Sequence, residues 1–554
     1  MYATAVVNEE WLSIRQTPWP PGLGLLLRAI IVLVGTSLVP VTASAARFRE
    51  LIVFGDSLSD TGNVLRSTDV PTLDPVPVSP PYFMGRFSNG PVWVERLAET
   101  LGLALQPSLD GGTNFAFGGA EIGSETEDLF ERDIGVLIPS LQQQVEAFLA
   151  ADFFGVEKVD PAALYVLWGG PNDLRDALHT PTDPLAEALT AVDELAGAIA
   201  ELADVGAVYF LVPNVPDLGK TPESLALGAA AQATAASTAF NNALTSTLDA
   251  LEAEHNIVIF RLDTFAWLDE VLADPAAFGF TNVTDACLDG DPFTGGSVCA
   301  NPAAHLFWDE LHPTAAGHTL LATLAAAALP PLIIIRGDES PEAVDVTVPD
   351  QDLPVLQVRL GTGPEAVRLT QVTLNFAEQS GPATLVQTLR VRLINDANAN
   401  GTLDTGETVL ATQTHAGIAA TLALDLTTPL EIPANATAHL VTILDINAPG
   451  GALAQHAFVF PLAWLAGLLP GLGLVIWPGL RRRRAVGLGI VILCVSLALT
   501  SCDTFKEDNN ADDQETLGFT VGIPTQGMTV EGTTSGPLTV PAVPITGASV
   551  RLRQ

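Results

Sequence analysis

Two widely separated segments of this 554-residue chain carry side chains that could together perform nucleophilic catalysis. Ser57 directly follows a short apolar run and Gly55-Asp56. A serine hydroxyl becomes a nucleophile when a general base lies beside it. The candidate base is His312, and Asp309 stands three residues before it. An aspartate at that spacing can hold one imidazole nitrogen and leave the other to take the serine proton. The pattern predicts acyl transfer by a Ser57–His312–Asp309 triad.

Short apolar runs that alternate with helical periods surround these residues. The runs predict buried strands at 51–54, 163–168, 207–212 and 257–260, and the helical periods lie at 92–101, 141–150, 186–202 and 225–251. Such alternation predicts a parallel sheet that is covered by helices on both faces. Sites in these folds lie at the carboxyl ends of the strands, which is where Ser57 stands.

Four blocks in this region resemble those of the GDSL, or SGNH, hydrolase family, and the resemblance covers about residues 48–330. A further segment, Pro81-Tyr82 through Gly90, resembles the family branch that contains plant and bacterial lipases and phospholipases. The four blocks, in order, are Gly55-Asp56-Ser57-Leu58, Asn114-Phe115-Ala116-Phe117-Gly118-Gly119-Ala120, Gly169-Gly170-Pro171-Asn172-Asp173 and Asp309-Glu310-Leu311-His312.

The resemblance implies both a fold and a set of oxyanion donors. The fold would be a flavodoxin-like three-layer α/β/α sandwich over residues 46–335. The backbone N–H groups of Ser57 and Gly119 and the side-chain amide of Asn172 would hold the oxyanion. Pro171 departs from the family pattern, which usually has Ala or no residue before the Asn.

The expected function is hydrolysis of carboxylic esters, with lipid or phospholipid acyl esters favoured by the lipase-like blocks. Deacetylation of an acetylated polysaccharide is the main rival activity. The competing class is a non-enzymatic surface protein with a hydrolase-like domain. Hydrolysis needs only water, so no catalytic cofactor is expected.

The charge balance excludes one class of partner. The chain has 24 Lys and Arg against 63 Asp and Glu, which gives a net charge of −39. A chain this acidic is not expected to bind a phosphate backbone, so no nucleic-acid partner is predicted.

Cys287 and Cys299 bracket a loop rich in Asp, Gly and Pro just before the Asp309 block. In an exported protein they are expected to form a disulfide that tethers the loop carrying the base. Two unpaired thiols are the alternative.

Strand-like segments without helical periodicity predict an all-β sandwich over residues 340–450. One loop in it fits the calcium pattern D-x-[DN]-x-[DN]-G-x₅-E. A structural Ca²⁺ is expected there, and a polar hairpin without metal is the alternative. The candidate ligands are Asp396, Asn398, Asn400, Thr402, Asp404 and Glu407.

The first 45 residues resemble a secretory signal, because an apolar stretch ends in Ala43-Ser44-Ala45. An uncleaved membrane anchor is the alternative. The mature protein is therefore expected in the envelope or outside a bacterial cell.

The region 457–501 contains two apolar runs, 457–480 and 485–500, separated by four arginines, Arg481 through Arg484. The first run is long enough to span a bilayer, and the arginines are expected on the cytoplasmic side. The second ends in Leu499-Thr500-Ser501-Cys502, which resembles a lipoprotein box with Cys502 as the lipidation site. Two interpretations stay open: a membrane hairpin, or a fused gene boundary. The acidic, Thr-, Gly- and Pro-rich tail 502–554 is assigned no function.

Overall fold

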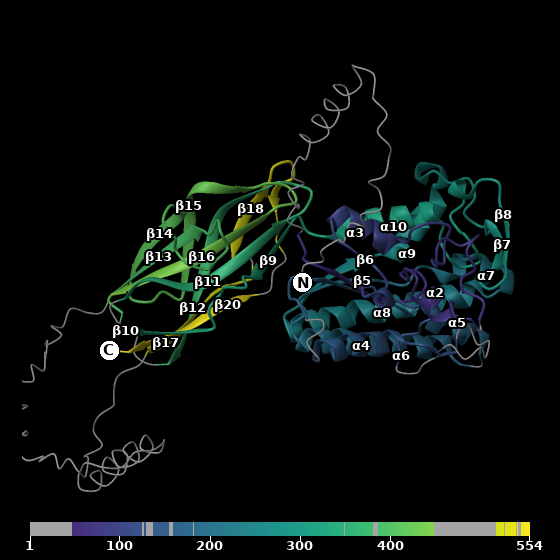
Figure 1. The fold of residues 1–554 in the computed structure, drawn as a ribbon, viewed down its shortest axis with the longest axis horizontal. Coiled ribbons are helices and arrows are strands. Elements are labelled where there is room, and N and C mark those ends of the chain that lie inside the picture. Colours follow the sequence, from purple (N-terminus) through teal and green to yellow (C-terminus); the bar gives the residue numbers. More distant parts are fainter. Residues whose placement is uncertain are drawn as a thin grey trace, which may run out of the picture.

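The computed structural model describes residues 47–447 and 517–553, apart from short gaps at 72, 124–126, 129–136, 154–158, 181, 348–349, 381–385, 526, 539 and 541–543. A helix-covered unit and an all-β unit lie side by side (Figure 1). The predicted signal 1–45, the predicted membrane region 457–501 and Cys502 lie outside the described residues. None of the helices in the described parts of the chain combines the length and the apolar character needed to cross a membrane.

The helix-covered unit, which we call the hydrolase unit after the family that its four sequence blocks resemble, is built on a parallel sheet. Residues 113–117 run parallel beside the first strand, because Phe115 N–H donates to Val53 O and Phe117 N–H donates to Gly55 O. The sheet continues in the order β1 (Leu51–Gly55), β4 (Leu164–Trp168), β5 (Tyr209–Pro213) and β6 (Val258–Leu262).

Helices cover both faces of this sheet (Figure 1), as the alternation of strands and helices predicts. Successive strand residues point to opposite faces, so alternate residues of the same strands enter two different cores. The prediction of a parallel sheet inside an α/β fold is confirmed. One face packs against α4 (Leu141–Phe153), α6 (Pro184–Asp204) and α8 (Ala230–His255), and the other against α3 (Trp93–Leu101), α9 (Thr264–Ala273) and α10 (Ala315–Ala328).

Shorter elements follow the strand ends and carry the site. They are α2 (Asn63–Thr68), α5 (Pro171–His179), α7 (Pro222–Leu227) and the hairpin of β7 (Leu288–Asp291) with β8 (Gly295–Val298). The small β2 (Glu127–Asp128) and β3 (Leu137–Ile138) form a separate pair.

The all-β unit is a sandwich of two sheets around one core. One sheet has the order β14 (Thr408–Ala416), β13 (Thr388–Asn395), β16 (Thr437–Asn447), β11 (Asp350–Thr362) and β9 (Leu332–Arg336). The other has the order β10 (Ala343–Thr347), β20 (Ile545–Arg553), β17 (Leu517–Ile523), β12 (Val367–Ser380), β18 (Met528–Gly532) and β19 (Gly536–Leu538), and β15 (Thr421–Ile432) also pairs with β12.

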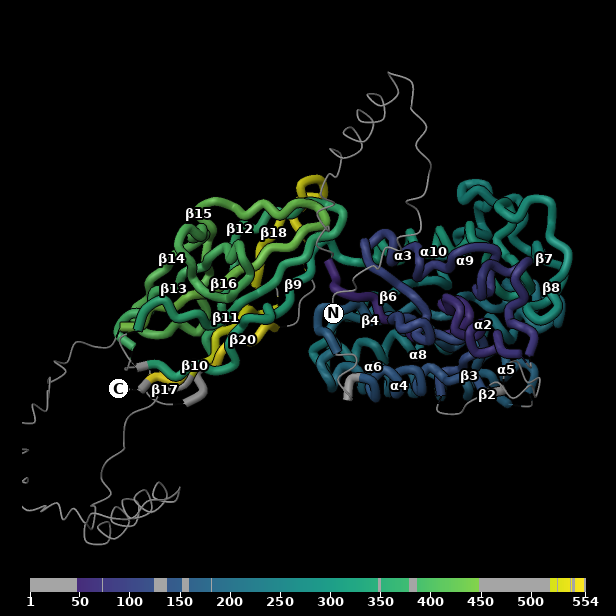
Figure 2. The backbone as a smooth tube through the Cα atoms, viewed as in Figure 1, coloured from purple at the N-terminus to yellow at the C-terminus, as the bar shows by residue number. Residues whose placement is uncertain are grey.

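The tail after residue 516 therefore has a structural role that the sequence did not reveal. Its strands β17 and β20 lie inside the second sheet, between β12 and β10 (Figure 2). Their apolar side chains, among them Phe519, Val521 and Val550, are fully buried in the sandwich core. The predicted sandwich range 340–450 is thus incomplete, because strand pairing between distant segments leaves no local pattern.

The strand β9 joins the two units. Ile333 and Ile335 enter the hydrolase core, whereas Leu332 and Ile334 enter the sandwich core. The Tyr209 hydroxyl of β5 donates a 2.6 Å hydrogen bond to the Ile334 carbonyl. The predicted boundary at 335 consequently cuts through a strand that both cores share.

Candidate active site

The loop after β1 presents Ser57 at the carboxyl end of the sheet. Buried Asp60 fixes this loop, because its Oδ1 accepts the N–H groups of Gly62 at 2.6 Å and Asn63 at 2.7 Å. Its Oδ2 accepts the Gly118 N–H at 3.0 Å, which ties the first block to the second. Burial raises the pKa of Asp60 to about 6, although these N–H donors favour the carboxylate.

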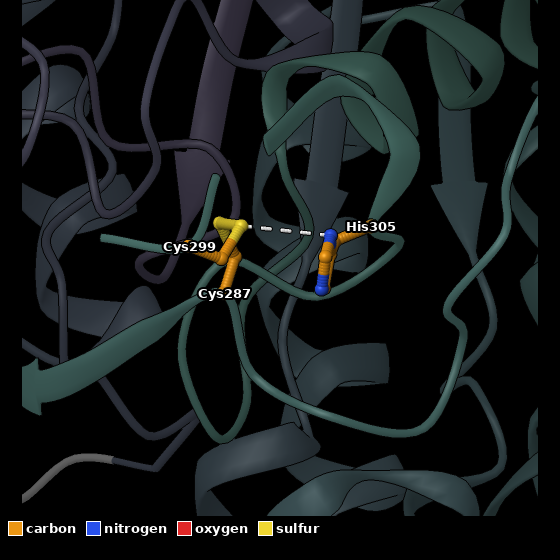
Figure 3. Close-up of side chains that lie close together, drawn as sticks. All are labelled: Cys287, Cys299 and His305. Carbon is orange, nitrogen blue, oxygen red and sulfur yellow. Dashed lines mark hydrogen bonds between the residues drawn. A yellow bond between two sulfur atoms is a disulfide. The ribbon is translucent and has the colours of Figure 1, made fainter. Parts of the chain in front are cut away.

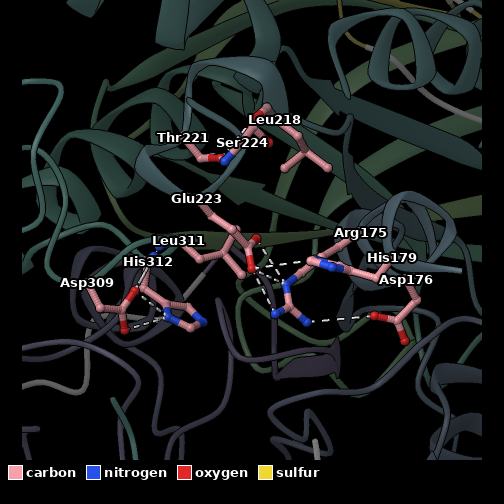
Figure 4. Close-up of polar contacts among 10 residues, drawn as sticks. All are labelled: Arg175, Asp176, His179, Leu218, Thr221, Glu223, Ser224, Asp309, Leu311 and His312. Atoms are coloured by element: carbon pink, nitrogen blue, oxygen red, sulfur yellow. Dashed lines mark hydrogen bonds and ion pairs between the residues drawn. The ribbon is translucent and has the colours of Figure 1, made fainter. Parts of the chain in front are cut away.

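The structure brings Ser57, His312 and Asp309 into one buried hydrogen-bonded chain. His312 Nε2 lies 2.7 Å from Ser57 Oγ. The other ring nitrogen, Nδ1, lies 2.8 Å from Asp309 Oδ2 and 2.9 Å from Oδ1 (Figure 4). Asp309 Oδ1 also accepts the backbone N–H groups of Leu311 and His312, so the turn that brings acid and base together is held by the acid itself.

Burial alone would raise the pKa of Asp309. The charge and hydrogen bond of His312, with the N–H donors of the turn, outweigh burial and lower this pKa below its ordinary value. Asp309 is therefore an anion suited to hold His312 in one tautomer and to stabilise its protonated form.

Tyr82 is a further member of the site that reasoning from residue types missed. Its hydroxyl donates a 2.8 Å hydrogen bond to Asp309 Oδ2. The ring is 2% exposed and packs edge-on against Trp308. Burial, and then the adjacent Asp309, raise the pKa of Tyr82, so it stays a hydrogen-bond donor. The signal in the sequence was the Pro81-Tyr82 segment, which gave a resemblance but no role.

The three predicted oxyanion donors lie in three segments: Ser57 after β1, Gly119 after the segment 113–117, and Asn172 at the start of α5. Asn172 is the second residue of α5 and lines the same cavity as Ser57 and His312. Its Nδ2 donates one hydrogen bond to Ala120 O at 2.8 Å, and an amide nitrogen carries a second proton. Gly119, next to Ala120, has a φ of 87°, in the left-handed region that favours glycine. Within the described residues, the N–H groups of Ser57 and Gly119 have no hydrogen-bond partner.

Pro171, the departure from the family pattern, is the first residue of α5. Proline suits this position because its fixed φ is helical and its missing N–H would have no partner in the helix. Pro171 therefore begins the helix that carries Asn172, and Asn172 stays in the first turn of that helix.

An apolar cavity opens beside the triad. Ser57, Asn172 and His312 are among the polar residues that line it. The rest of the wall is largely apolar and includes Trp168, Leu218, Trp267, Leu268, Phe307 and Leu311. The arrangement can hold an apolar substituent while a carbonyl group faces Ser57.

Cys287 and Cys299 form a disulfide in the structure (Figure 3). The bonded pair lies next to residues 307–312, which we call the acid–base loop, because Cys287 N–H donates to Phe307 O and Leu288 N–H donates to Trp308 O. His305 Nδ1 lies 3.5 Å from Cys299 Sγ. In the described part of the chain this is the one cluster of three His, Cys, Asp or Glu side chains with converging ligand atoms, and its bonded sulfurs are not free to ligate a metal.

The six predicted calcium ligands lie in one loop between β13 and β14 of the sandwich. Gly401 N–H donates to Asp396 Oδ2, and the amides of Asn398 and Asn400 each donate to Asp404 Oδ2 at 2.7 Å. Three other hydrogen bonds close the loop: Thr402 N–H donates to Asn400 Oδ1, and the N–H groups of Ala397 and Asp404 donate to the Glu407 carboxylate.

Comparison with known proteins places residues 51–325 in one family, described as GDSL-like Lipase/Acylhydrolase. The chain is 31% identical over 309 residues to a phosphatidylcholine-sterol acyltransferase of Aeromonas hydrophila, covering 54% of this chain and 85% of that protein. It is 29% identical over 338 residues to a GDSL esterase/lipase of Arabidopsis thaliana, covering 50% of this chain and 86% of that protein.

Among solved structures, an alpha/beta hydrolase enzyme from the metagenome of Lake Arreo is 16% identical, with a TM-score of 0.29. The match covers 51% of this chain and 95% of that one. The family match and the relatives that this chain covers almost fully lead to one conclusion: the chain belongs to the GDSL-like lipase/acylhydrolase family and is a carboxylic ester hydrolase.

Proposed function

We propose that the protein hydrolyses acyl esters of lipids through Ser57, with His312 as general base and acid and Asp309 as its orienting carboxylate. The observation that carries the proposal is the 2.7 Å approach of His312 Nε2 to Ser57 Oγ, with Asp309 on the opposite nitrogen. A nucleophile, a base and an orienting group in hydrogen-bond contact are the elements that acyl transfer requires.

The reaction has two half-steps. Ser57 Oγ bonds to the ester carbonyl carbon while its proton passes to His312 Nε2, and the carbonyl electron pair moves onto oxygen. The tetrahedral intermediate then breaks the bond to the leaving alcohol, which takes the proton from His312. Water repeats the sequence on the acyl-enzyme: His312 accepts its proton, the carboxylic acid leaves, and the proton returns to Ser57.

The oxyanion of each intermediate would bind the N–H groups of Ser57 and Gly119 and the second amide proton of Asn172. Two contacts support these roles: the Asn172 amide donates to Ala120 O, and Gly118, the neighbour of Gly119, donates to Asp60. Both segments that carry a donor are therefore held by hydrogen bonds within the protein. Removal of one such donor is expected to lower kcat by about 10²–10³-fold.

The apolar cavity favours a long acyl chain over an acetyl group. Its wall contains two tryptophans and several leucines next to Ser57, and burial of each methylene of a chain contributes about 0.8 kcal/mol. An acetyl group of a polysaccharide would leave most of this wall uncovered. The names of the relatives, which include a phosphatidylcholine-sterol acyltransferase, agree with a lipid substrate.

The test uses the full chain with p-nitrophenyl acetate and p-nitrophenyl octanoate. We expect kcat/KM to be higher for octanoate, and Ser57→Ala to lose at least about 10⁴-fold in kcat. Ser67→Ala is the matched control, because its hydroxyl donates to Asn63 O within α2 and has no other hydrogen bond in the part of the chain that the structure describes. Equal activity of both variants would reject the triad, whereas a preference for acetate would favour the polysaccharide substrate.

We also propose that the loop from Asp396 to Glu407 binds a structural Ca²⁺. An amide oxygen and nitrogen exchange places by rotation, so Asn398 and Asn400 can present oxygen beside the Asp404 carboxylate. Calcium is expected to raise the Tm of the sandwich, EGTA to reverse the rise, and Asp396→Ala to abolish it. A Tm that does not change when Ca²⁺ is added or removed would contradict the proposal.

We propose further that the protein is exported to the bacterial envelope through residues 1–45 and is held there by the region 457–501. Strands on both sides of this region complete one sandwich, which supports one continuous product over a fused gene boundary. Mass spectrometry of the native protein tests both points: we expect an N-terminus at Ala46, and residues 517–553 on the same chain as residues 47–447. A C-terminus near residue 484, or a product that starts at Cys502, would contradict continuity.

A further inference from the structure

An ion pair links the helix that carries the oxyanion amide to the loop that carries the base. Arg175 lies on α5, three residues after Asn172. Its Nε lies 2.9 Å and 3.0 Å from the two carboxylate oxygens of Glu223, and a second guanidinium nitrogen lies 2.8 Å from one of them (Figure 4). Such multiple contacts fix direction as well as distance.

Glu223 continues the connection through its backbone. It lies in the first turn of α7, and its N–H donates a 3.0 Å hydrogen bond to the carbonyl of Glu310. Glu310 stands between Asp309 and His312. The connection is therefore short. Asn172 and Arg175 lie one helical turn apart, Arg175 pairs with Glu223, and the Glu223 backbone bonds to the acid–base loop.

The same segment forms part of the cavity wall. Leu218 and Thr221, just before Glu223, line the cavity with Leu311 of the acid–base loop. Thr221 caps α7 by accepting the Ser224 N–H, and its hydroxyl donates to Leu218 O. Glu223 thus belongs to a segment with its own internal bonds, and Arg175 attaches that segment to α5.

The environment of the pair separates it from an ordinary surface ion pair. The Glu223 side chain is 15% exposed and the Arg175 side chain 34% exposed. His179 Nε2 lies 3.8 Å from Glu223, and Asp176 lies 3.7 Å from Arg175. Water and salt screen a buried carboxylate less than an exposed one, so the guanidinium of Arg175 holds the Glu223 carboxylate more firmly than it would hold a fully exposed carboxylate.

We infer that Arg175 and Glu223 are positioning residues, which set the Asn172 amide relative to His312 and Ser57. The inference rests on the proposed function, since it concerns the geometry of the same reaction. Neither residue touches the reacting atoms. Displacement of an oxyanion donor by as little as about 1 Å can lower turnover by as much as about 10²-fold.

The experiment uses the full chain, p-nitrophenyl octanoate, and the variants Arg175→Gln, Glu223→Gln and both together. We expect each single variant to lose about 10- to 100-fold in kcat with a smaller change in KM. The double variant should be no worse than the single ones, because both remove one interaction. Glu252→Gln is the control: it breaks a remote pair with Arg261, 2.8 Å long, whose side chains are 34% and 35% exposed. It should leave kcat unchanged.

A further experiment, made in the Asn172→Ala variant, distinguishes a positioning role of Arg175 and Glu223 from a purely structural one. In Asn172→Ala the amide to be positioned is gone, so Glu223→Gln should then cost less than about threefold in kcat. A loss as large as in the wild-type background, or one that only follows a lower Tm, would overturn the inference. The Ser57→Ala result tests the proposed function separately, since it does not depend on Arg175 or Glu223.

Discussion

The two units of the molecule are assembled in opposite ways. The hydrolase unit uses one stretch of chain, in which each parallel strand is followed by a helix that packs back on the sheet. The sandwich uses two stretches, and β17 and β20 from the second stretch lie between β10 and β12 from the first. Local sequence patterns are enough to recognise the first kind of unit, whereas the second depends on pairing between distant segments.

The shared strand β9 makes this contrast sharper. Its side chains pack alternately into the hydrolase core and the sandwich core, although the strand directly follows the last helix of the hydrolase unit. A contiguous α/β unit can therefore supply an edge strand to a sandwich without losing its own core.

Removal of residues 517–554 should have the largest effect. The truncated chain lacks β17–β20, so β12 and β10 lose neighbours and the apolar core of the sandwich is exposed. We expect the segment 337–447 to become protease-sensitive while ester hydrolysis is retained. Limited proteolysis with an activity assay measures both. Protease resistance equal to that of the full chain would show that the sandwich does not need its second stretch.

Paired substitutions in β9 should divide their effects between the two units. Ile333→Ala should destabilise the hydrolase unit and Ile334→Ala the sandwich, each by about 2–5 kcal/mol, since both side chains are buried. Hydrogen exchange followed by mass spectrometry resolves the units, and each variant is the control for the other. Equal loss of protection in both units would mean that they unfold as one.

The disulfide should stabilise only the hydrolase unit. Cys287→Ser with Cys299→Ser opens a ring with a sequence separation of 12 residues, for which the expected loss is about 3 kcal/mol. Urea unfolding followed by tryptophan fluorescence measures it, because Trp93, Trp168, Trp267 and Trp308 all lie in this unit. Reduced wild-type protein should show the same loss, and an unchanged midpoint would contradict the tethering role.

Tyr82→Phe should have the smallest effect, about 1.5–2 kcal/mol, because it removes one hydrogen bond to a buried carboxylate. Asp309 has a pKa below its ordinary 3.8, so it contributes stability above that pH and loses it as pH falls through the lowered pKa. In the variant this pKa should rise, and the loss should begin at higher pH. The difference in Tm between the wild-type protein and Tyr82→Phe should therefore be greatest at neutral pH and vanish in acid.

Tyr165→Phe is the control for this last prediction. The Tyr165 hydroxyl donates to Asp160 O, a neutral backbone group, so its removal should shift Tm without changing the pH dependence. The same pH dependence in both variants would show that Tyr82 does not stabilise the Asp309 carboxylate.

Much of the hydrolase unit could be predicted because its information is local. Ser57 follows a buried strand, Asp309 and His312 share one turn, and Asn172 follows another strand end. Tyr82 and the Arg175–Glu223 pair could not be found this way. Each is an ordinary residue whose partner lies far along the chain: 227 residues for Tyr82 and Asp309, and 48 for Arg175 and Glu223.

The sequence by itself determined the chemistry of this protein: which hydroxyl, imidazole and carboxylate are available, and which strand ends can present them. Only the tertiary structure decided how those groups are supported, and that residues beyond 516 complete a sandwich that begins at β9, near residue 332. The physical reason is that periodicity and turn residues record a residue's own backbone and burial. A hydrogen bond or strand pair between distant segments exists only after the chain has folded.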